Sequence, residues 1–78
     1  MRVKTMRLVI TFHTTAQAIA AERFFKENGI PGRLIPVPRE ITAGCGMAWS
    51  APPEEEGRIR DVMEQKLAPW EGWHRLLV

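Results

Sequence analysis

A chain of 78 residues is enough for one domain and too short for two, so we take residues 1–78 as a single domain. Such a chain buries only about 60% of its unfolded surface, which leaves little room for a deep catalytic cavity and favours a carrier, adaptor or regulatory module over an enzyme. The net charge of +2 does not require a nucleic-acid partner, and no apolar run approaches the length of roughly 20 residues that a membrane-spanning helix needs.

The first elements along the chain are a strand and a helix. Residues 6–12 alternate with period two and have one wholly apolar face, which predicts a half-buried strand. Thr14 and Gln17 fit a capping box, and residues 16–28 are predicted to form a helix that the segment Gly29-Ile30-Pro31 ends. The predicted buried stripe of this helix consists of Ala18, Ala21, Phe24 and Phe25.

Three more strands and a second helix follow. Residues 32–37 and residues 47–51 are predicted strands. Residues 54–56 are three glutamates in the first turn of the second helix, where the helix dipole favours negative charge. Pro69 ends this helix, and residues 73–78 form the final strand. The predicted apolar stripe of the second helix consists of Ile59, Val62, Met63 and Leu67.

The order β-α-β-β-α-β predicts an α+β, ferredoxin-like fold. In this arrangement a four-stranded antiparallel sheet carries both helices on one face, and the second strand lies at an edge. Pro36 and Pro38 are two residues apart, so their missing N–H groups fall on the same side of that strand. An edge strand tolerates this loss and a central strand does not, so the prolines and the element order predict the same topology.

The connection before the third strand contains the only cysteine of the chain, Cys45. Gly44 and Gly46 flank it, so backbone N–H groups can approach the sulfur and a partner can reach it. Arg39 is near enough in sequence to fold back and favour the reactive thiolate, and Glu40 is placed to shuttle a proton or to hold Arg39. We therefore expect Cys45 to be a solvent-reachable, reactive thiol. The supporting residues are Arg39 and Glu40, and the surrounding ligand or loop positions are Gly44, Gly46, Pro36 and Pro38.

Each of these residues also has a purely structural interpretation. A lone cysteine is often a small, buried core residue. Arg39 and Glu40 would then form a surface ion pair, and the prolines would protect the sheet edge from pairing with another chain.

The histidines and tryptophans give no further chemistry from the sequence. His13 and His74 have no partners at metal-ligand spacing, so we predict no metal site and no cofactor. The three tryptophans are expected to anchor a core or an interface rather than stack on bases. The aromatic-rich basic strand of RNA-recognition modules is missing, and we expect no nucleic-acid partner.

Three parts of the sequence together resemble a known small family. They are residues 10–15, the helix from Ala18 to Gly29-Ile30-Pro31, and Pro36-Val37-Pro38-Arg39-Glu40 followed by Cys45-Gly46. They are similar to the selenium/sulfur (Se/S) carrier protein-like family, formerly a domain of unknown function, over about residues 6–50 and more loosely beyond. Members of that family often have a serine where this chain has His13 and another where it has Gly44, which leaves the role of His13 open.

The resemblance implies that Cys45 carries sulfur or selenium as a persulfide or perselenide, with Arg39 and Glu40 in the accompanying motif. The partners would be a donor such as a cysteine desulfurase and an acceptor enzyme. A carrier must lack a resolving cysteine, which would displace the persulfide as a disulfide, and a single cysteine meets that condition. The alternative is a non-catalytic regulatory or protein-interaction module with the same fold, and a third option is a thiol enzyme.

Composition also predicts the compartment and the association state. One cysteine cannot form an internal disulfide, which indicates the reducing cytoplasm, and we expect neither a signal peptide nor a membrane segment. Residues 1–39 hold seven Lys or Arg and two acidic residues, whereas residues 40–78 hold four Lys or Arg and seven acidic residues. This asymmetry gives either two solvated faces or a field that attracts an anionic ligand or partner. Val9, with Trp49 or Trp73, is expected on the uncovered sheet face, which predicts a homodimer.

Overall fold

The computed structural model describes residues 5–41 and 44–78. The basic start at residues 1–4, and residues 42–43 of the connection before Cys45, lie outside the described residues. The elements in chain order are β1 (Met6–Thr11), α1 (Thr15–Glu27), β2 (Arg33–Pro36), β3 (Met47–Ala51), a 3-10 turn η1 (Pro53–Glu55), α2 (Glu56–Lys66) and β4 (Gly72–Leu77).

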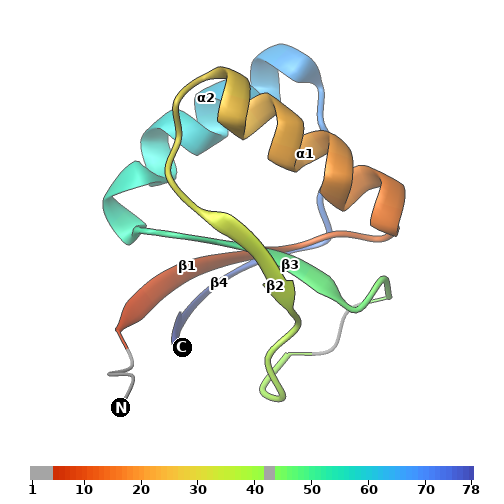
Figure 1. The fold of residues 1–78 in the computed structure, drawn as a ribbon, viewed down its shortest axis with the longest axis vertical. Helices are drawn as coiled ribbons and strands as arrows, with labels where there is room; N and C mark the ends of the chain where they lie inside the picture. Colours follow the sequence, from red (N-terminus) through yellow and green to blue (C-terminus); the bar gives the residue numbers. More distant parts are fainter. Residues whose placement is uncertain (1–4, 42–43) are drawn as a thin grey trace.

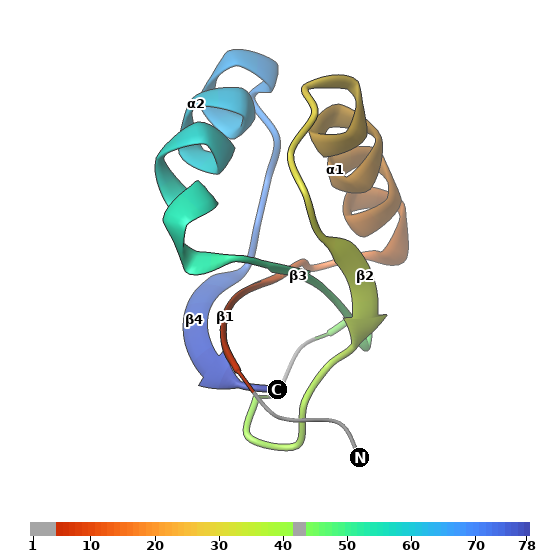
Figure 2. The ribbon, with the colours of Figure 1, turned by 60° about the vertical axis from the view of Figure 1, so that its left-hand side comes forward.

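The strands form one antiparallel sheet in the order β2-β3-β1-β4. Both helices lie on the same face of this sheet (Figure 1), and they run side by side above it (Figure 2). The predicted ferredoxin-like α+β fold is therefore confirmed. Each predicted boundary lies within about two residues of the observed one, as expected where helix and strand ends fray.

The second strand is an edge strand, as the prolines predicted. Within residues 5–41 and 44–78, β2 pairs only with β3. Between the two prolines, the N–H of Val37 donates to the carbonyl of Gly46 at 3.0 Å and therefore faces β3. The nitrogens of Pro36 and Pro38 consequently face the free edge, where no ladder donor is needed.

The first helix begins and ends as the sequence predicted. At its start, Thr14 Oγ1 accepts a hydrogen bond from the Gln17 N–H at 3.1 Å. The Gln17 side chain does not return this bond to Thr14, because its Oε1 accepts from the N–H of His13 instead. At its end, the Ile30 N–H donates to the Phe25 carbonyl at 2.9 Å, and Ile30 is buried. This is the Schellman arrangement expected at a glycine cap.

The second helix differs from its prediction at both ends. Its first turn is the 3-10 turn η1, and the α-helix starts only at Glu56. The predicted stripe is buried at Ile59, Val62 and Met63, but Leu67 is 88% exposed, so its assignment to the core was wrong. The physical reason is that Leu67 has left the helix. Its φ of 50° turns the side chain away from the apolar face.

The main core lies between the helices and the sheet. Trp49 is fully buried there, and its ring packs against that of Phe25 with centroids 4.9 Å apart. The remaining buried members are Leu8, Ile10, Phe12, Ala18, Ala21, Ile30, Ala51, Ile59, Val62 and Met63. In the described part of the chain, no helix combines the length and the apolar character needed to cross a membrane.

The face of the sheet without helices has a small core of its own. Val9 is 0% exposed there and packs with Ile41 and Ala48. Ile41 belongs to the connection after β2, which therefore supplies part of this cover. The expectation that Val9 and a tryptophan are exposed on this face was wrong, because Val9 is buried, Trp49 lies in the main core, and Trp73 packs half-buried against that core.

Candidate functional site

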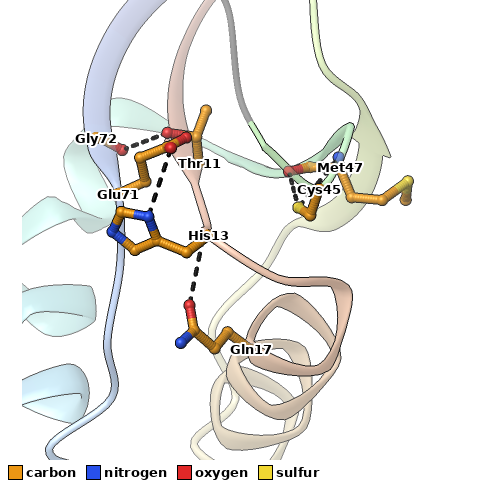
Figure 3. Close-up of polar contacts among 7 residues, drawn as sticks. All are labelled: Thr11, His13, Gln17, Cys45, Met47, Glu71 and Gly72. Atoms are coloured by element: carbon orange, nitrogen blue, oxygen red, sulfur yellow. Dashed lines mark hydrogen bonds and ion pairs between the residues drawn. The ribbon is translucent and has the colours of Figure 1, made fainter.

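Cys45 lies in the turn that leads into β3. Its sulfur is half-buried and forms two contacts with the backbone of Met47 (Figure 3). The thiol donates to the Met47 carbonyl at 3.3 Å, and the Met47 N–H donates to the sulfur at 3.4 Å. The side chain also packs against the edge of the main core. Cys45 is therefore neither a fully buried core residue nor a freely exposed one.

The two glycines beside Cys45 serve different purposes. Gly46 has a φ of +74°, a left-handed backbone conformation that residues other than glycine rarely adopt. Space is not the limit there, because a Cβ would meet nothing within 4 Å. At Gly44 the space is tight, because a Cβ on it would lie 3.2 Å from the carbonyl oxygen of His13 and a small shift would be needed to fit it. The cysteine turn thus fits closely against the junction between β1 and α1.

The proline segment and the cysteine turn are joined directly. The Val37 N–H is the only backbone donor within residues 36–38, and it binds the carbonyl of Gly46. The structure therefore connects two parts of the sequence motif that lie nine residues apart in the chain.

Arg39 and Glu40 occupy a separate turn. The Ile41 N–H donates to the Pro38 carbonyl at 3.0 Å and closes this turn, and both charged side chains are exposed. Figure 1 shows residues 38–41 on the side of the sheet opposite the helices, apart from the turn at residues 44–46. Within residues 5–41 and 44–78, no hydrogen bond or ion pair connects Arg39 or Glu40 with Cys45 or with each other.

His13 pairs with a residue that sequence reasoning did not consider. Its Nδ1 lies 3.5 Å from Oε1 of Glu71, and the imidazole points toward Glu71 and away from Cys45 (Figure 3). The Glu71 N–H also donates to the Thr11 carbonyl at 2.7 Å. The signal for this pair was topological: β1 and β4 are antiparallel neighbours, so the residues just after β1 meet those just before β4.

The site supplies one thiol that backbone groups of Met47 hold. Among the described residues, no group of three or more His, Cys, Asp and Glu side chains is placed to bind a metal ion. Loss of the Cys45 proton would strengthen the contact with the Met47 N–H, but the Met47 carbonyl would then face a thiolate and repel it. The ionised sulfur is therefore expected to move away from that carbonyl, toward solvent.

Comparison with known families covers most of the chain. The family model described as "Putative Se/S carrier protein-like" matches residues 7–75. The chain belongs to this family. The match extends past residue 50, to residue 75. Searches of the curated proteins and of the solved structures gave no match.

Membership of the family gives the site its context. The family's description names a carrier of selenium or sulfur, and a carrier interacts with other proteins. Among the described residues, Cys45 has the only thiol, the side chain best suited to hold either element.

Proposed function

We propose that this protein carries sulfur or selenium on Cys45, as a persulfide or a perselenide, between a donor such as a cysteine desulfurase and an acceptor enzyme. The observation that carries the proposal is the position of Cys45, the only cysteine of the chain, in a glycine-flanked turn where backbone groups alone hold the sulfur. Family membership supports the same conclusion.

The proposed transfer needs no external oxidant. The Cys45 thiol loses its proton to solvent, and the thiolate attacks the outer sulfur of the donor's persulfide. A new S–S bond forms on Cys45 while the donor's S–S bond breaks, and the donor leaves as a thiolate that takes up a proton. A nucleophile of the acceptor then attacks the same outer sulfur and releases the Cys45 thiolate. With selenium, the corresponding bonds are S–Se.

The lack of a second cysteine stabilises the loaded state. A neighbouring thiolate would attack the inner sulfur of the persulfide and expel the cargo as hydrosulfide, leaving a disulfide. This chain has no such thiol. The half-buried position of Cys45 further limits attack by small thiols from solution.

Arg39 and Glu40 fit contacts with the partner enzymes better than contacts with the sulfur. Both are exposed on the turn at residues 38–41 and form no bond to Cys45. We propose that Arg39 and Glu40 orient the donor or acceptor. The distance between the turn at residues 38–41 and the cysteine turn would be fixed by Pro36, Pro38, Gly44 and Gly46.

The experiment is to load the protein enzymatically and weigh it. After incubation with a cysteine desulfurase and cysteine, the intact mass should increase by one sulfur atom. The increase should vanish on treatment with a reductant and be absent in Cys45→Ser, which keeps the fold because serine can form the same pair of bonds to Met47. An unchanged mass, together with a thiol that alkylates only after denaturation, would exclude the carrier function.

Arg39→Ala separates partner recognition from thiol reactivity. Its alkylation by iodoacetamide should stay within about twofold of the unchanged protein, since Arg39 is exposed, forms no hydrogen bond with Cys45 among the described residues, and is screened by salt. Its loading by the desulfurase should be slower. Arg23→Ala, which removes an exposed arginine of α1, is the matched control for both measurements. Equal rates of enzymatic loading in both variants would contradict this role of Arg39.

The proposal also covers the cellular compartment, the association state and the alternative function. A thiol that works without a disulfide partner fits the reducing cytoplasm. We retain the homodimer as a proposal, with the free edge of β4 as its interface, because among the described strands β4 pairs only with β1. The alternative function, a non-catalytic regulatory module, would leave Cys45 unloaded.

A further inference from the structure

A groove of about 730 Å³ lies on the helix-free face of the sheet, and Cys45 is not among its described lining residues. It extends from the start of β1 across β3 to the edge strand β2. The lining residues are Thr5, Arg7, Arg33, Leu34, Ile35, Pro36, Pro38, Ser50 and Val78. This volume lies within the range of about 300–1,000 Å³ typical of sites for small molecules.

Arg7 is held in this groove by a buried hydroxyl group. Its Nε donates to Oγ of Ser50 at 3.0 Å, and one terminal nitrogen donates to the Ser50 carbonyl at 3.4 Å. Ser50 is only 4% exposed. The guanidinium of Arg7 is therefore oriented before any ligand arrives, which lowers the entropy lost on binding.

Arg33 lines the same groove from β2. It lies directly opposite Ser50 in the register of β2 and β3, while the Arg7 side chain reaches Ser50 from β1. The two strands that neighbour β3 thus each contribute one arginine to the groove.

No side chain among the described lining residues is acidic. Within residues 5–41 and 44–78, neither arginine takes part in an ion pair, either with a side chain or with the terminal carboxylate of Val78. Two like charges on one concave surface repel each other and raise the local concentration of anions. Guanidinium groups also bind carboxylates and phosphates through paired hydrogen bonds.

We propose that this groove binds a small organic anion. Its carboxylate or phosphate lies between Arg7 and Arg33, and its apolar part lies against Ile35, Pro38 and Val78. The apolar walls make an organic body necessary, because an inorganic ion would leave them uncovered. The site contains neither Cys45 nor its turn, so the inference stands independently of the carrier function. It gives a binding role to Pro36 and Pro38 in addition to edge protection.

The test is an NMR titration that follows the backbone amides and the arginine Nε–H signals. Phenyl phosphate and benzoate probe the two anionic groups, and inorganic phosphate and phenol probe the anion and the ring alone. We expect either organic anion to shift the signals of Arg7, Arg33 and Ile35 saturably. The better of the two should bind at least about tenfold more tightly than inorganic phosphate or phenol, a difference of about 1.4 kcal/mol.

Variants decide whether the arginines form the site. Arg33→Gln should weaken binding by about tenfold, as expected for one charge-assisted hydrogen bond to an anion. Arg23→Gln and Cys45→Ser should bind as the unchanged protein does, and the amide spectrum of each variant reports its fold. Three outcomes would overturn the proposal. The first is no saturable shift with either organic anion, and the second is a shift of the Arg23 signals in the unchanged protein as large as that of the Arg33 signals. The third is full affinity in folded Arg33→Gln. If a polyglutamate peptide bound the groove saturably and neither organic anion did, the proposal would also be overturned, and the groove would instead bind a protein partner.

Discussion

Leu67 adopts a backbone conformation that suits glycine better. It ends α2 with φ 50° and ψ 39°. The following N–H, that of Ala68, donates to the Met63 carbonyl at 2.9 Å, and the Leu67 N–H donates to the Glu64 carbonyl at 3.2 Å. This is again the Schellman arrangement, here with a leucine at the left-handed position. The left-handed region costs a residue with a Cβ about 1–2 kcal/mol.

Leu67→Gly should therefore stabilise the protein. The side chain is 88% exposed, so its removal loses little packing. Glycine relieves the backbone strain, but its greater freedom in the unfolded chain offsets part of that stabilisation. The free energy of unfolding should therefore rise by about 0.5–1 kcal/mol. Urea denaturation measures it. Leu67→Ala is the control: it keeps the Cβ and should gain nothing, and an equal gain in both variants would show that backbone strain is not the cause.

Gly32 is the position least tolerant of a side chain. Its φ is +149°, and a Cβ there would lie 2.6 Å from the Ser50 carbonyl oxygen and 2.7 Å from the buried ring of Trp49. Neither neighbour can move freely, because one is strand backbone and the other is in the core. We expect Gly32→Ala to lower the free energy of unfolding by about 2 kcal/mol or more.

Gly57 provides the matched substitution for this measurement. It lies in α2, and a Cβ on it would meet nothing within 4 Å. Because alanine favours helices over glycine, Gly57→Ala should raise the free energy of unfolding by up to about 1 kcal/mol. Opposite signs for the two variants in the same urea experiment are expected. A loss at both positions would contradict the steric explanation.

At the scale of elements, Glu56 connects the start of α2 to the sheet. Its carboxylate pairs with the guanidinium of Arg75 on β4 and accepts from Arg60 Nε at 3.1 Å. The hydrogen bond from Arg75 is the main cause that lowers the pKa of Glu56 below its usual 4.5, and the bond from Arg60 acts in the same direction. Arg60 in turn lies over the ring of Trp73, 4.3 Å from its centroid.

Stability at this contact should depend on pH. A carboxylate whose folded pKa is lowered stabilises the fold above pH 4.5, and this contribution is lost as the pH falls through the folded pKa. Glu56→Gln should therefore unfold at lower urea concentration than the unchanged protein at pH 7, and the difference should shrink by pH 3. Glu54→Gln, at an exposed position of η1, is the control. A difference between Glu56→Gln and the unchanged protein that stays constant with pH would contradict the assignment.

At the scale of the whole molecule, the two edges of the sheet differ. β2 is short, and its prolines remove donors from the free edge. β4 has six residues without a proline and pairs on one side only, and its Leu77, opposite Met6, is exposed. An edge of this kind is the more open to pairing with another chain.

The homodimer stays a prediction, and its interface is proposed at this edge. Sedimentation equilibrium at high micromolar concentration should give twice the monomer mass of 8.9 kDa. Leu77→Lys, which adds charge at the exposed end of β4, should shift the equilibrium to the monomer. Ile19→Lys changes an exposed apolar residue of α1 and serves as control. A mass of 8.9 kDa across the concentration range would contradict the dimer.

Local sequence rules predicted most elements of this fold. The strand β1, the Thr14 cap and the glycine end of α1 all depend on residues within a short stretch of the chain, and each is found where expected. The prediction that β1 is half-buried was wrong, because residues 8–11 are all buried and both faces of the sheet are covered there. The edge position of β2 was also predictable, because a proline removes a hydrogen-bond donor wherever the strand is placed. Leu67 was misassigned because its spacing continues the helical pattern one residue beyond the helix.

Some features of the candidate site were likewise determined by the sequence, and others only by the tertiary structure. The sequence alone determined the fold class, the single thiol and its flanking glycines, since these depend on residue type and local order. Tertiary structure alone decided that Met47 holds the sulfur, that His13 faces Glu71, and that Arg7 and Arg33 line one groove. It also decided that, among the described residues, Arg39 forms no hydrogen bond with Cys45. These contacts depend on strand register and on the directions of side chains, which are set by the packing of segments far apart in the chain.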